Sequence, residues 1–486
     1  MNKYVYAGLI VFLLISFASA QQFETQLFTS YEKYRENRIN NRRVKHAEIL
    51  PLIAAYKGKE GFTVKKVGSS IGGRELQLIS FGNGKTDIFL WSQMHGDEST
   101  ATMALFDILN FFTDDEFEEE KKLILKNVKI HMLPMLNPDG AELFQRRNLL
   151  GIDINRDALR LQSPEGRTLK KVRDSLDADF GFNLHDQSRY YNALLTPEAA
   201  TISFLAPAYN YEKSINEVRG DAMKIIVLMN EVLQKYIPGG VGRYNDDFEP
   251  RAFGDNIQKW GTSTILIESG GYKNDTQKQF IRKLNFVSIL TAIKRISDGS
   301  YKNINRKKYT EIPNNDRKLF DLKITGLTYK LEGSNYILDL GIHRLEKNKN
   351  QAKDFYYVGS VSDQGDLSTY YGYEEVDLSG FNYVPARVYP EVLQNFNEVM
   401  QLDFEELLKS GYAYVQVEVL PESFPDVKFP LHLVQKGYSP PQKQVPGINA
   451  TFFVEKAGVL THAVVNGFLI DLSSWDGSFD NALILN

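Results

Sequence analysis

The sequence of 486 residues contains no cysteine. The chain therefore forms no disulfide bond and has no thiol that could attack a substrate or bind a metal ion. Any bound metal must be held by histidine and carboxylate side chains. A basic excess is absent too, because 57 lysines and arginines stand against 61 aspartates and glutamates, for a formal net charge of -4. Nucleic-acid binding usually requires a basic surface, so we do not expect it.

A long apolar run occurs at the very start of the sequence. Lys3 precedes the run, which extends from Tyr6 to about Phe17 and is followed by small residues at 18–20. This order is typical of a secretory signal peptide that is cleaved before Gln21. An uncleaved membrane anchor is the alternative, but the run is shorter than the ~20 apolar residues that span a bilayer. We therefore expect export to a bacterial periplasm or to the medium, and no membrane span after removal of the signal.

The remaining sequence divides into two textures. After a signal peptide at 1–20, residues 21–300 alternate strand patterns with helix patterns, which favours an α/β fold: a mixed, mostly parallel sheet covered by helices on both faces. The polar stretch 301–316 is typical of a linker. Residues 317–486 contain alternating apolar and polar stretches with one predicted helix near 392–408. This second region is therefore predicted to be a β-rich domain.

Hydrophobic periodicity locates the elements of the α/β region. Short apolar runs predict buried strands, and apolar residues at helical spacing predict amphipathic helices. Residues 21–56 also look helical and are highly charged. The predicted strands are 87–91, 128–135, 180–184 and 263–267, and the predicted helices are 101–112, 222–236 and 277–297.

Polar residues that can bind a metal follow three of these strands. His95 and Glu98 come after the first, His185 ends the third, and Glu268 ends the fourth. Charged groups beside apolar strands are costly unless they are paired or ligating, and open α/β sheets place their sites at the carboxyl ends of strands. The spacing of His95 and Glu98 puts both on one side of a first helical turn. An ordinary helix start with a favourable acidic residue would have the same spacing.

Turns and arginines lie between these positions. The segment 137–140, Asn-Pro-Asp-Gly, predicts a turn. Arg146 and Arg147 follow it, and then the pair Asn155-Arg156. Arginines presented from a loop are suited to bidentate capture of a carboxylate, although solvated surface arginines would look the same in the sequence.

In this order, the motifs resemble those of the zinc metallocarboxypeptidases, over about residues 56–297. The resemblance rests on His95 with Glu98, the segment 137–140, Arg146, Asn155-Arg156, His185 and Glu268. It implies one zinc ion held by His95, Glu98 and His185, with a fourth position left for water. It also implies that Glu268 is the base that takes a proton from that water and passes it to the leaving amine.

The resemblance assigns further roles. Arg146, with Arg147 as the alternative, would stabilise the developing oxyanion. Asn155 and Arg156 would bind the terminal carboxylate of the substrate, and Tyr244 is the candidate for the flexible tyrosine of the family. A specificity residue is expected within 253–255. The digestive members carry an arginine inside the zinc loop where this chain has Asp97, which indicates a different branch.

The implied activity is hydrolysis of the C-terminal peptide bond of a peptide or peptide-like substrate. Hydrolysis of cell-wall peptides of the γ-D-glutamyl-diaminopimelate type is the first alternative. Zinc-dependent deacylation of small amides and a non-catalytic binding module on the same fold are the others. The β-rich region has no catalytic motif that we can identify, and the sequence predicts no oligomeric state.

Overall fold

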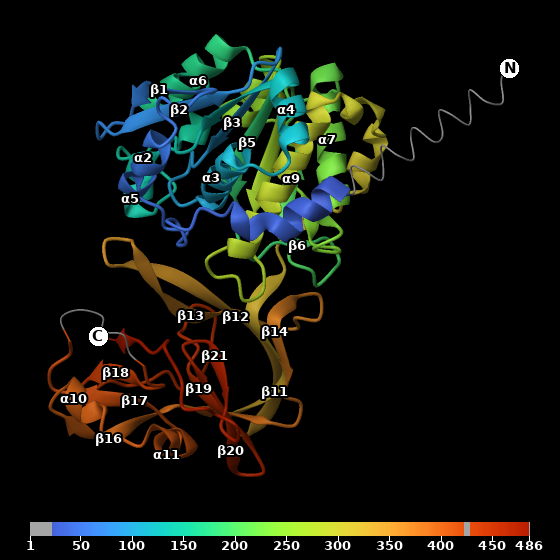
Figure 1. Cartoon of the computed structure of the whole chain (residues 1–486). Coiled ribbons are helices and arrows are strands. Elements are labelled where there is room, and N and C mark those ends of the chain that lie inside the picture. The colour runs from blue at the N-terminus through green and yellow to red at the C-terminus, as the bar shows by residue number, and fades with distance from the viewer. Residues whose placement is uncertain (1–21, 422–427, 486) are drawn as a thin grey trace. The chain divides into compact units, whose positions relative to one another are not determined.

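The structure is a computed structural model that describes residues 22–421 and 428–485 (Figure 1). It divides into two compact units, Met1–Arg317 and Lys318–Asn486. The predicted signal peptide lies outside the described residues. None of the described helices combines the length and the apolar character of a membrane span.

An eight-stranded sheet of order β1-β2-β4-β3-β5-β9-β7-β8 forms the centre of unit 1. Four of its seven strand pairs are parallel: β3 with β4, β3 with β5, β5 with β9, and β7 with β8. The other three pairs are antiparallel. The mixed, mostly parallel sheet is thus confirmed. Its strands are β1 (Phe62–Ser69), β2 (Glu75–Phe81), β3 (Thr86–Ser92), β4 (Val128–Leu133), β5 (Phe180–Asp186), β7 (Ile202–Leu205), β8 (Val241–Arg243) and β9 (Ser263–Ser269).

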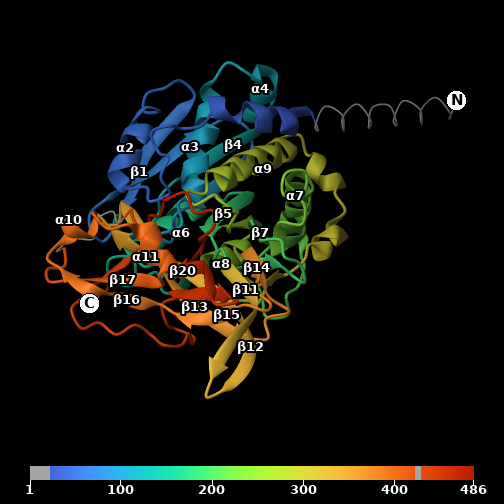
Figure 2. The same cartoon turned by 90° about the horizontal axis from the view of Figure 1, so that it is seen from below.

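Helices cover both faces of this sheet, as predicted. Successive strand residues point to opposite faces, so on β3 Ile88 and Leu90 join one apolar core while Phe89 and Trp91 join another. The first core includes residues of α2, α3, α4, α7 and α9, and the second includes residues of α6 and α8. Figures 1 and 2 show these helices around the sheet. The helices of unit 1 are α2 (His46–Ala54), α3 (Thr100–Thr113), α4 (Glu118–Asn127), α5 (Pro138–Leu143), α6 (Pro164–Leu176), α7 (Glu217–Leu233), α8 (Phe253–Lys259) and α9 (Gln279–Ser297), with the 3-10 turns η1 (Tyr31–Lys33), η2 (Ile154–Arg156), η3 (Ser300–Asn303) and η4 (Arg306–Glu311).

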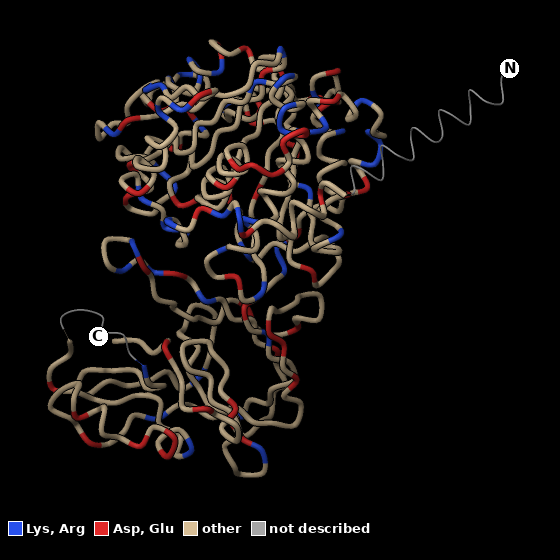
Figure 3. Tube along the Cα trace, in the orientation of Figure 1, with Lys and Arg blue, Asp and Glu red and all other residues tan. Residues whose placement is uncertain are grey.

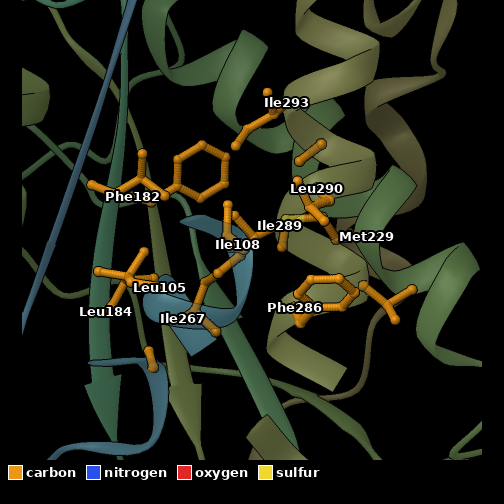
Figure 4. Close-up of a cluster of buried hydrophobic side chains, with 14 of the residues drawn as sticks. Leu105, Ile108, Phe182, Leu184, Met229, Ile267, Phe286, Ile289, Leu290 and Ile293 are labelled. Atoms are coloured by element: carbon orange, nitrogen blue, oxygen red, sulfur yellow. The ribbon is translucent and has the colours of Figure 1, made fainter. Parts of the chain in front are cut away.

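The first core fixes the orientation of the two central strands. Figure 4 shows Phe182 and Leu184 of β5 and Ile267 of β9 directed toward α9. Because side chains alternate along a strand, the residues next to these three point to the opposite face. His185 and Glu268 directly follow Leu184 and Ile267, so they lie on that opposite face.

Two segments of unit 1 differ from the prediction. Residues 21–56 do not form one helix: 22–30 are helical, η1 follows, and α2 begins only at His46. The predicted linker at 301–316 packs on unit 1, since Tyr309 is 1% exposed and its hydroxyl accepts the Ala206 N–H at 3.0 Å. Its last residues form β10 (Asn315–Asp316), which pairs with β6 (Asn192–Ala193). Residues 301–316 are polar in composition, but the buried ring of Tyr309 anchors them to unit 1.

A buried ion pair attaches the N-terminal segment to α3 and α9. The Arg282 Nε donates to Asp107 Oδ2 at 2.7 Å, and neither side chain is exposed. Tyr31 Oη donates to the same oxygen at 2.9 Å, and the Glu36 N–H donates to Asp107 Oδ1 at 2.8 Å. Both carboxylate oxygens are thus satisfied, the condition under which a fold tolerates a buried charge.

Unit 2 is rich in β-strands, as predicted. One sheet has the order β13-β12-β11-β15-β19-β20-β21 with β14 paired to β11, and a second has the order β16-β17-β18-β22. The strands are β11 (Leu319–Leu331), β12 (Ser334–Lys349), β13 (Asp354–Gly365), β14 (Tyr371–Asp377), β15 (Asn382–Pro385), β16 (Arg387–Leu393), β17 (Tyr412–Val417), β18 (His432–Gln435), β19 (Phe452–Lys456), β20 (Val459–Val465), β21 (Phe468–Asp471) and β22 (Ile484–Leu485).

The single helix predicted near 392–408 is wrong. The structure has the end of β16 there, followed by two short helices, α10 (Phe396–Val399) and α11 (Phe404–Lys409). Asn395 accepts the Asn397 N–H at 2.9 Å, and Asp403 accepts the Glu406 N–H at 3.0 Å. Each of these side chains caps the start of a separate short helix, so one continuous helix does not form.

Acidic and basic residues are intermixed along the traces of both units (Figure 3). Exposed pairs within one helix result from this mixing, such as Lys122 with Glu118 at 2.9 Å. Such pairs contribute little to stability because water screens them. We therefore expect the exposed pairs to contribute much less to stability than the buried Arg282–Asp107 pair.

We expect Arg282→Met to lower the free energy of unfolding of unit 1 by about 3–5 kcal/mol, because Asp107 becomes an unpaired buried carboxylate. Urea unfolding followed by the fluorescence of Trp91 and Trp260 measures the change. The control Lys122→Met removes an exposed pair and should change the free energy by less than about 1 kcal/mol. An equally small change in Arg282→Met would contradict the anchoring role.

Candidate metal centre

The first two site residues lie in the loop between β3 and α3. They precede the helix and do not lie on its first turn as expected; the Glu98 N–H donates to the His95 carbonyl in a turn, at 3.2 Å. A Cβ at Gly96 would lie 2.0 Å from the carbonyl carbon of Gly140. Any other residue at position 96 would push the loop away from this backbone. The loop is therefore held against the Asn-Pro-Asp-Gly turn.

The next two residues lie at the carboxyl ends of neighbouring strands. His185 of β5 is directly opposite Glu268 of β9 in the parallel ladder. Their neighbours Leu184 and Ile267 point into the core beside α9 (Figure 4). His185 and Glu268 consequently share the other face, at the edge of the sheet where α/β folds place their sites.

Three polar side chains converge on one point. Glu98 Oε1 lies 2.7 Å from His95 Nδ1, Glu98 Oε2 lies 2.7 Å from His185 Nδ1, and the two Nδ1 atoms are 3.2 Å apart. Zinc bonds of about 2.0–2.1 Å at the tetrahedral angle would place two ligand nitrogens about 3.3 Å apart. Among the described residues, His95, Glu98 and His185 form the one group whose spacing suits a metal ion. The three residues thus fit a single zinc-sized cation.

Burial and mutual charge perturb this cluster strongly. Burial alone would lower the pKa of His95, but Glu98 and Asp153 raise that pKa to about 9. Burial lowers the pKa of His185. Burial opposes ionisation of Glu98, yet the two histidines hold its pKa well below the usual value. Burial, followed by the charge of Glu98, raises the pKa of Glu268 well above the usual value. Two neighbouring carboxyl groups whose pKa values are shifted in opposite directions are typical of acid–base sites.

Asp153 is a site residue that the sequence analysis did not single out. Its Oδ1 lies 3.2 Å from His95 Nε2, and its Oδ2 accepts Arg146 Nε at 3.0 Å. A carboxylate at the second nitrogen of a histidine fixes the tautomer and leaves Nδ1 available to a metal. Asp153 also caps η2, because its Oδ1 accepts the Asn155 N–H at 3.0 Å. Its position two residues before the Asn155-Arg156 pair is the feature of the sequence that could have identified it.

The two candidate arginines point to different places. Arg146 Nη1 lies 3.2 Å from His95 Nδ1 and 3.5 Å from Glu98 Oε1. Arg147 Nη1 instead donates to the carbonyl of Gly151 at 3.0 Å, at the surface. The structure therefore brings Arg146, and not Arg147, to the cluster.

Asn155 and Arg156 lie beside the segment 253–255. Asn155 Oδ1 accepts the Phe253 N–H at 2.9 Å, at the start of α8. Arg156 is 37% exposed at its side chain and its Nε lies 3.4 Å from Glu249 Oε2. Asp255 is 9% exposed, and burial raises its pKa to about 7. The segment expected to carry specificity thus contains a buried acid.

Tyr244 is near the candidate base. Its ring packs against Tyr191 with centroids 5.8 Å apart. Burial, followed by the charge of Glu268, raises the pKa of Tyr244. Asp97, at the position that marked a departure from the family, is also perturbed, because burial and Glu98 raise its pKa to about 6.

Comparison with known proteins shows what part of this chain is similar to. Residues 55–190 match the model of the family described as zinc carboxypeptidase. These residues are therefore similar to the zinc carboxypeptidases. The matched segment contains the three clustered residues, Arg146 and the Asn155-Arg156 pair, whereas Tyr244 and Glu268 lie beyond the matched residues.

Two curated carboxypeptidases are similar to part of this chain. Carboxypeptidase SOL1 of Arabidopsis thaliana is 28% identical over 175 residues, which cover 30% of this chain and 35% of that protein. Carboxypeptidase E of Caenorhabditis elegans is 30% identical over 116 residues, which cover 20% and 25%. The crystal structure of carboxypeptidase A from Helicoverpa armigera aligns with a TM-score of 0.44 at 15% identity, over 59% of this chain and 82% of that one. The chain spans about a third or less of the length of these curated relatives.

We expect the metal-free protein to bind zinc, and to gain about 2.7 kcal/mol in unfolding free energy when free zinc is at 100 times the Kd. His185→Ala should remove this gain, because two ligands remain where three are needed. Calorimetric titration and urea unfolding, after dialysis against a chelator, measure both effects. His462→Ala, a half-buried histidine of unit 2, is the matched control. Unchanged zinc affinity in His185→Ala would rule the cluster out as the metal site.

Proposed function

We propose that the protein is a zinc-dependent metallocarboxypeptidase that hydrolyses the C-terminal bond of a peptide. One observation carries the proposal: His95, Glu98 and His185 form a single zinc-sized site, and Glu268 is directly opposite His185 on the same face of the sheet. A zinc ion held there would supply a Lewis acid and would lower the pKa of a water molecule.

The side chains around the cluster supply the remaining chemistry. Glu268 takes a proton from the attacking water and gives it to the leaving amine. Arg146, held by Asp153 through Nε at 3.0 Å, donates to the oxyanion that develops on the scissile carbonyl. A guanidinium fixed by a carboxylate keeps its direction before the substrate arrives, so little reorganisation is needed during the reaction.

Recognition of a free C-terminus is assigned to a neighbouring set of residues. Asn155 and Arg156 bind the terminal carboxylate of the substrate. The guanidinium of Arg156 is partly exposed, and its N–H donors can bind the two oxygens of a carboxylate together. Tyr244 closes on the substrate from the side of Glu268. These assignments make the enzyme an exopeptidase, because an internal peptide segment has no carboxylate to offer Arg156.

Several alternatives share the same metal centre. Cell-wall peptides would satisfy Glu268 and Arg146 equally well, and export, which rests on residues 1–20, suits both substrates. Deacylation of small amides is less well supported, because two relatives with this segment are named carboxypeptidases. A binding module is disfavoured because the metal ligands and the base are all present.

The decisive experiment is a panel of N-blocked peptides and muropeptides, assayed with zinc and with a chelator. We expect release of C-terminal amino acids by the zinc-loaded protein and a kcat lower by about 10²–10⁴-fold in Glu268→Gln, which keeps the size of the side chain but cannot accept the proton. Cleavage of muropeptides alone would favour the first alternative. If zinc is bound and no peptide bond is cut, the binding-module function replaces the proposal.

Adjacent arginines offer a matched test of the oxyanion role. We expect Arg146→Met to lower kcat by about 10²–10³-fold, because a donor to the transition state is lost. Arg147→Met should retain the rate of the wild type, since Arg147 donates to the Gly151 carbonyl outside the cluster. Equal losses in the two variants would show that general loop stability, and not donation from Arg146, accounts for the effect.

A further inference from the structure

A largely buried ion pair lies beside the candidate metal ligands His95, Glu98 and His185. Lys278 Nζ is 3.0 Å from Asp186 Oδ2, and their side chains are 13% and 8% exposed. Asp186 immediately follows His185 at the end of β5, and Lys278 immediately precedes α9. Neither residue was singled out by its sequence pattern, and neither has a role in the proposed chemistry.

Lys278 links the strand ends that carry a metal ligand and the base. Besides pairing with Asp186, its Nζ donates to the Ser269 carbonyl at 2.9 Å. Ser269 directly follows Glu268, just as Asp186 directly follows His185. One ammonium group therefore contacts the residue after the ligand and the residue after the base.

Asp186 extends the connection to the loop that carries Glu98. Its Oδ2 accepts the Thr100 hydroxyl at 2.6 Å, and Thr100 is the first residue of α3, two positions after Glu98. The Asp186 N–H donates to Glu98 Oε2 at 3.2 Å. Asp186 thus contacts the ligand carboxylate through its backbone and the helix start through its side chain.

The backbone fixes Lys278 in this position. Lys278 has a φ of 52°, in the left-handed region that non-glycine residues rarely adopt. Asp275 accepts the Gln279 N–H at 2.7 Å and the Ile281 N–H at 3.1 Å, and so caps α9 immediately after Lys278. Backbone strain of this kind persists where the surroundings determine the conformation.

We propose that the Asp186–Lys278 pair is a positioning device that sets the separation of His185, Glu98 and Glu268. The inference rests on the proposed function only in taking Glu268 as the base. Asp186 is a third buried carboxylate next to Glu98 and Glu268, and its charge would repel both if it were unpaired. Lys278 supplies the compensating charge and joins the two strand ends at the same time. Without it, the ligands and the base would separate.

The test compares Lys278→Met with Lys294→Met on the same helix. Lys294 is also largely buried, at 16% side-chain exposure, and pairs with Asp298 at 3.4 Å, away from the cluster. Zinc affinity is measured by competition with a chromogenic chelator, and kcat and KM are measured on the best peptide of the panel. Lys278→Arg, which keeps the charge, and Asp186→Asn, which removes the pair from its other side, complete the set.

We expect Lys278→Met and Asp186→Asn to weaken zinc binding by about 10-fold or more, the range found when groups that support metal ligands are removed. Their kcat should fall with KM little changed, because Arg156 and Asn155 still bind the substrate. Lys278→Arg should recover part of both losses, and Lys294→Met should match the wild type. Circular dichroism identifies any variant that fails to fold, and the other member of the pair then provides the test.

The outcomes separate this inference from the proposed function. A wild type that binds zinc but cuts no peptide would refute the peptidase, while weaker zinc binding by Lys278→Met than by Lys294→Met would still support the positioning role. Zinc affinity and kcat in Lys278→Met equal to those of the wild type would refute the positioning role, even if the peptidase is active.

Discussion

The carboxylate of Glu98 is the constraint on which the site depends. Its two oxygens each lie 2.7 Å from an imidazole Nδ1, one from the loop after β3 and one from the end of β5. A carboxylate this deeply buried is costly without partners. The parallel pairing of β3 with β5 brings those partners to it, because it places the carboxyl ends of the two strands side by side. Sheet topology therefore sets the geometry of the candidate metal site directly.

Strand alternation separates stability from chemistry in the same elements. Leu184 and Ile267 fill the core beside α9, while the adjacent residues His185 and Glu268 face the other side. A shift of one residue in the β5–β9 register would displace His185 relative to Glu268. The apolar core thus holds the candidate metal ligand His185 and the proposed base Glu268 in fixed relative positions, and the reaction proposed for them depends on that packing.

The contacts that orient the cluster come from residues with unremarkable sequence surroundings. Asp153 supports His95 and Arg146, and the Asp186–Lys278 pair connects strand ends with a helix start. Periodicity could not reveal them, because polar residues in loops resemble ordinary surface residues. The same limitation applies to residues 301–316, where a buried tyrosine packs the predicted linker on unit 1. The helix predicted near 392–408 is wrong because side-chain caps start two separate short helices there.

The sequence alone determined the alternation of strands and helices in unit 1, the β-rich character of unit 2, and the candidate ligands His95, Glu98 and His185. The alternation and the β-rich character follow from local periodicity, and the candidate ligands follow from the order of short motifs along the chain. Tertiary structure decided that Arg146 and not Arg147 reaches the cluster, that Asp153 orients His95, and that Lys278 meets Asp186. Those contacts join residues as far as 92 positions apart, and strand order and register, rather than spacing along the chain, determine which of them meet.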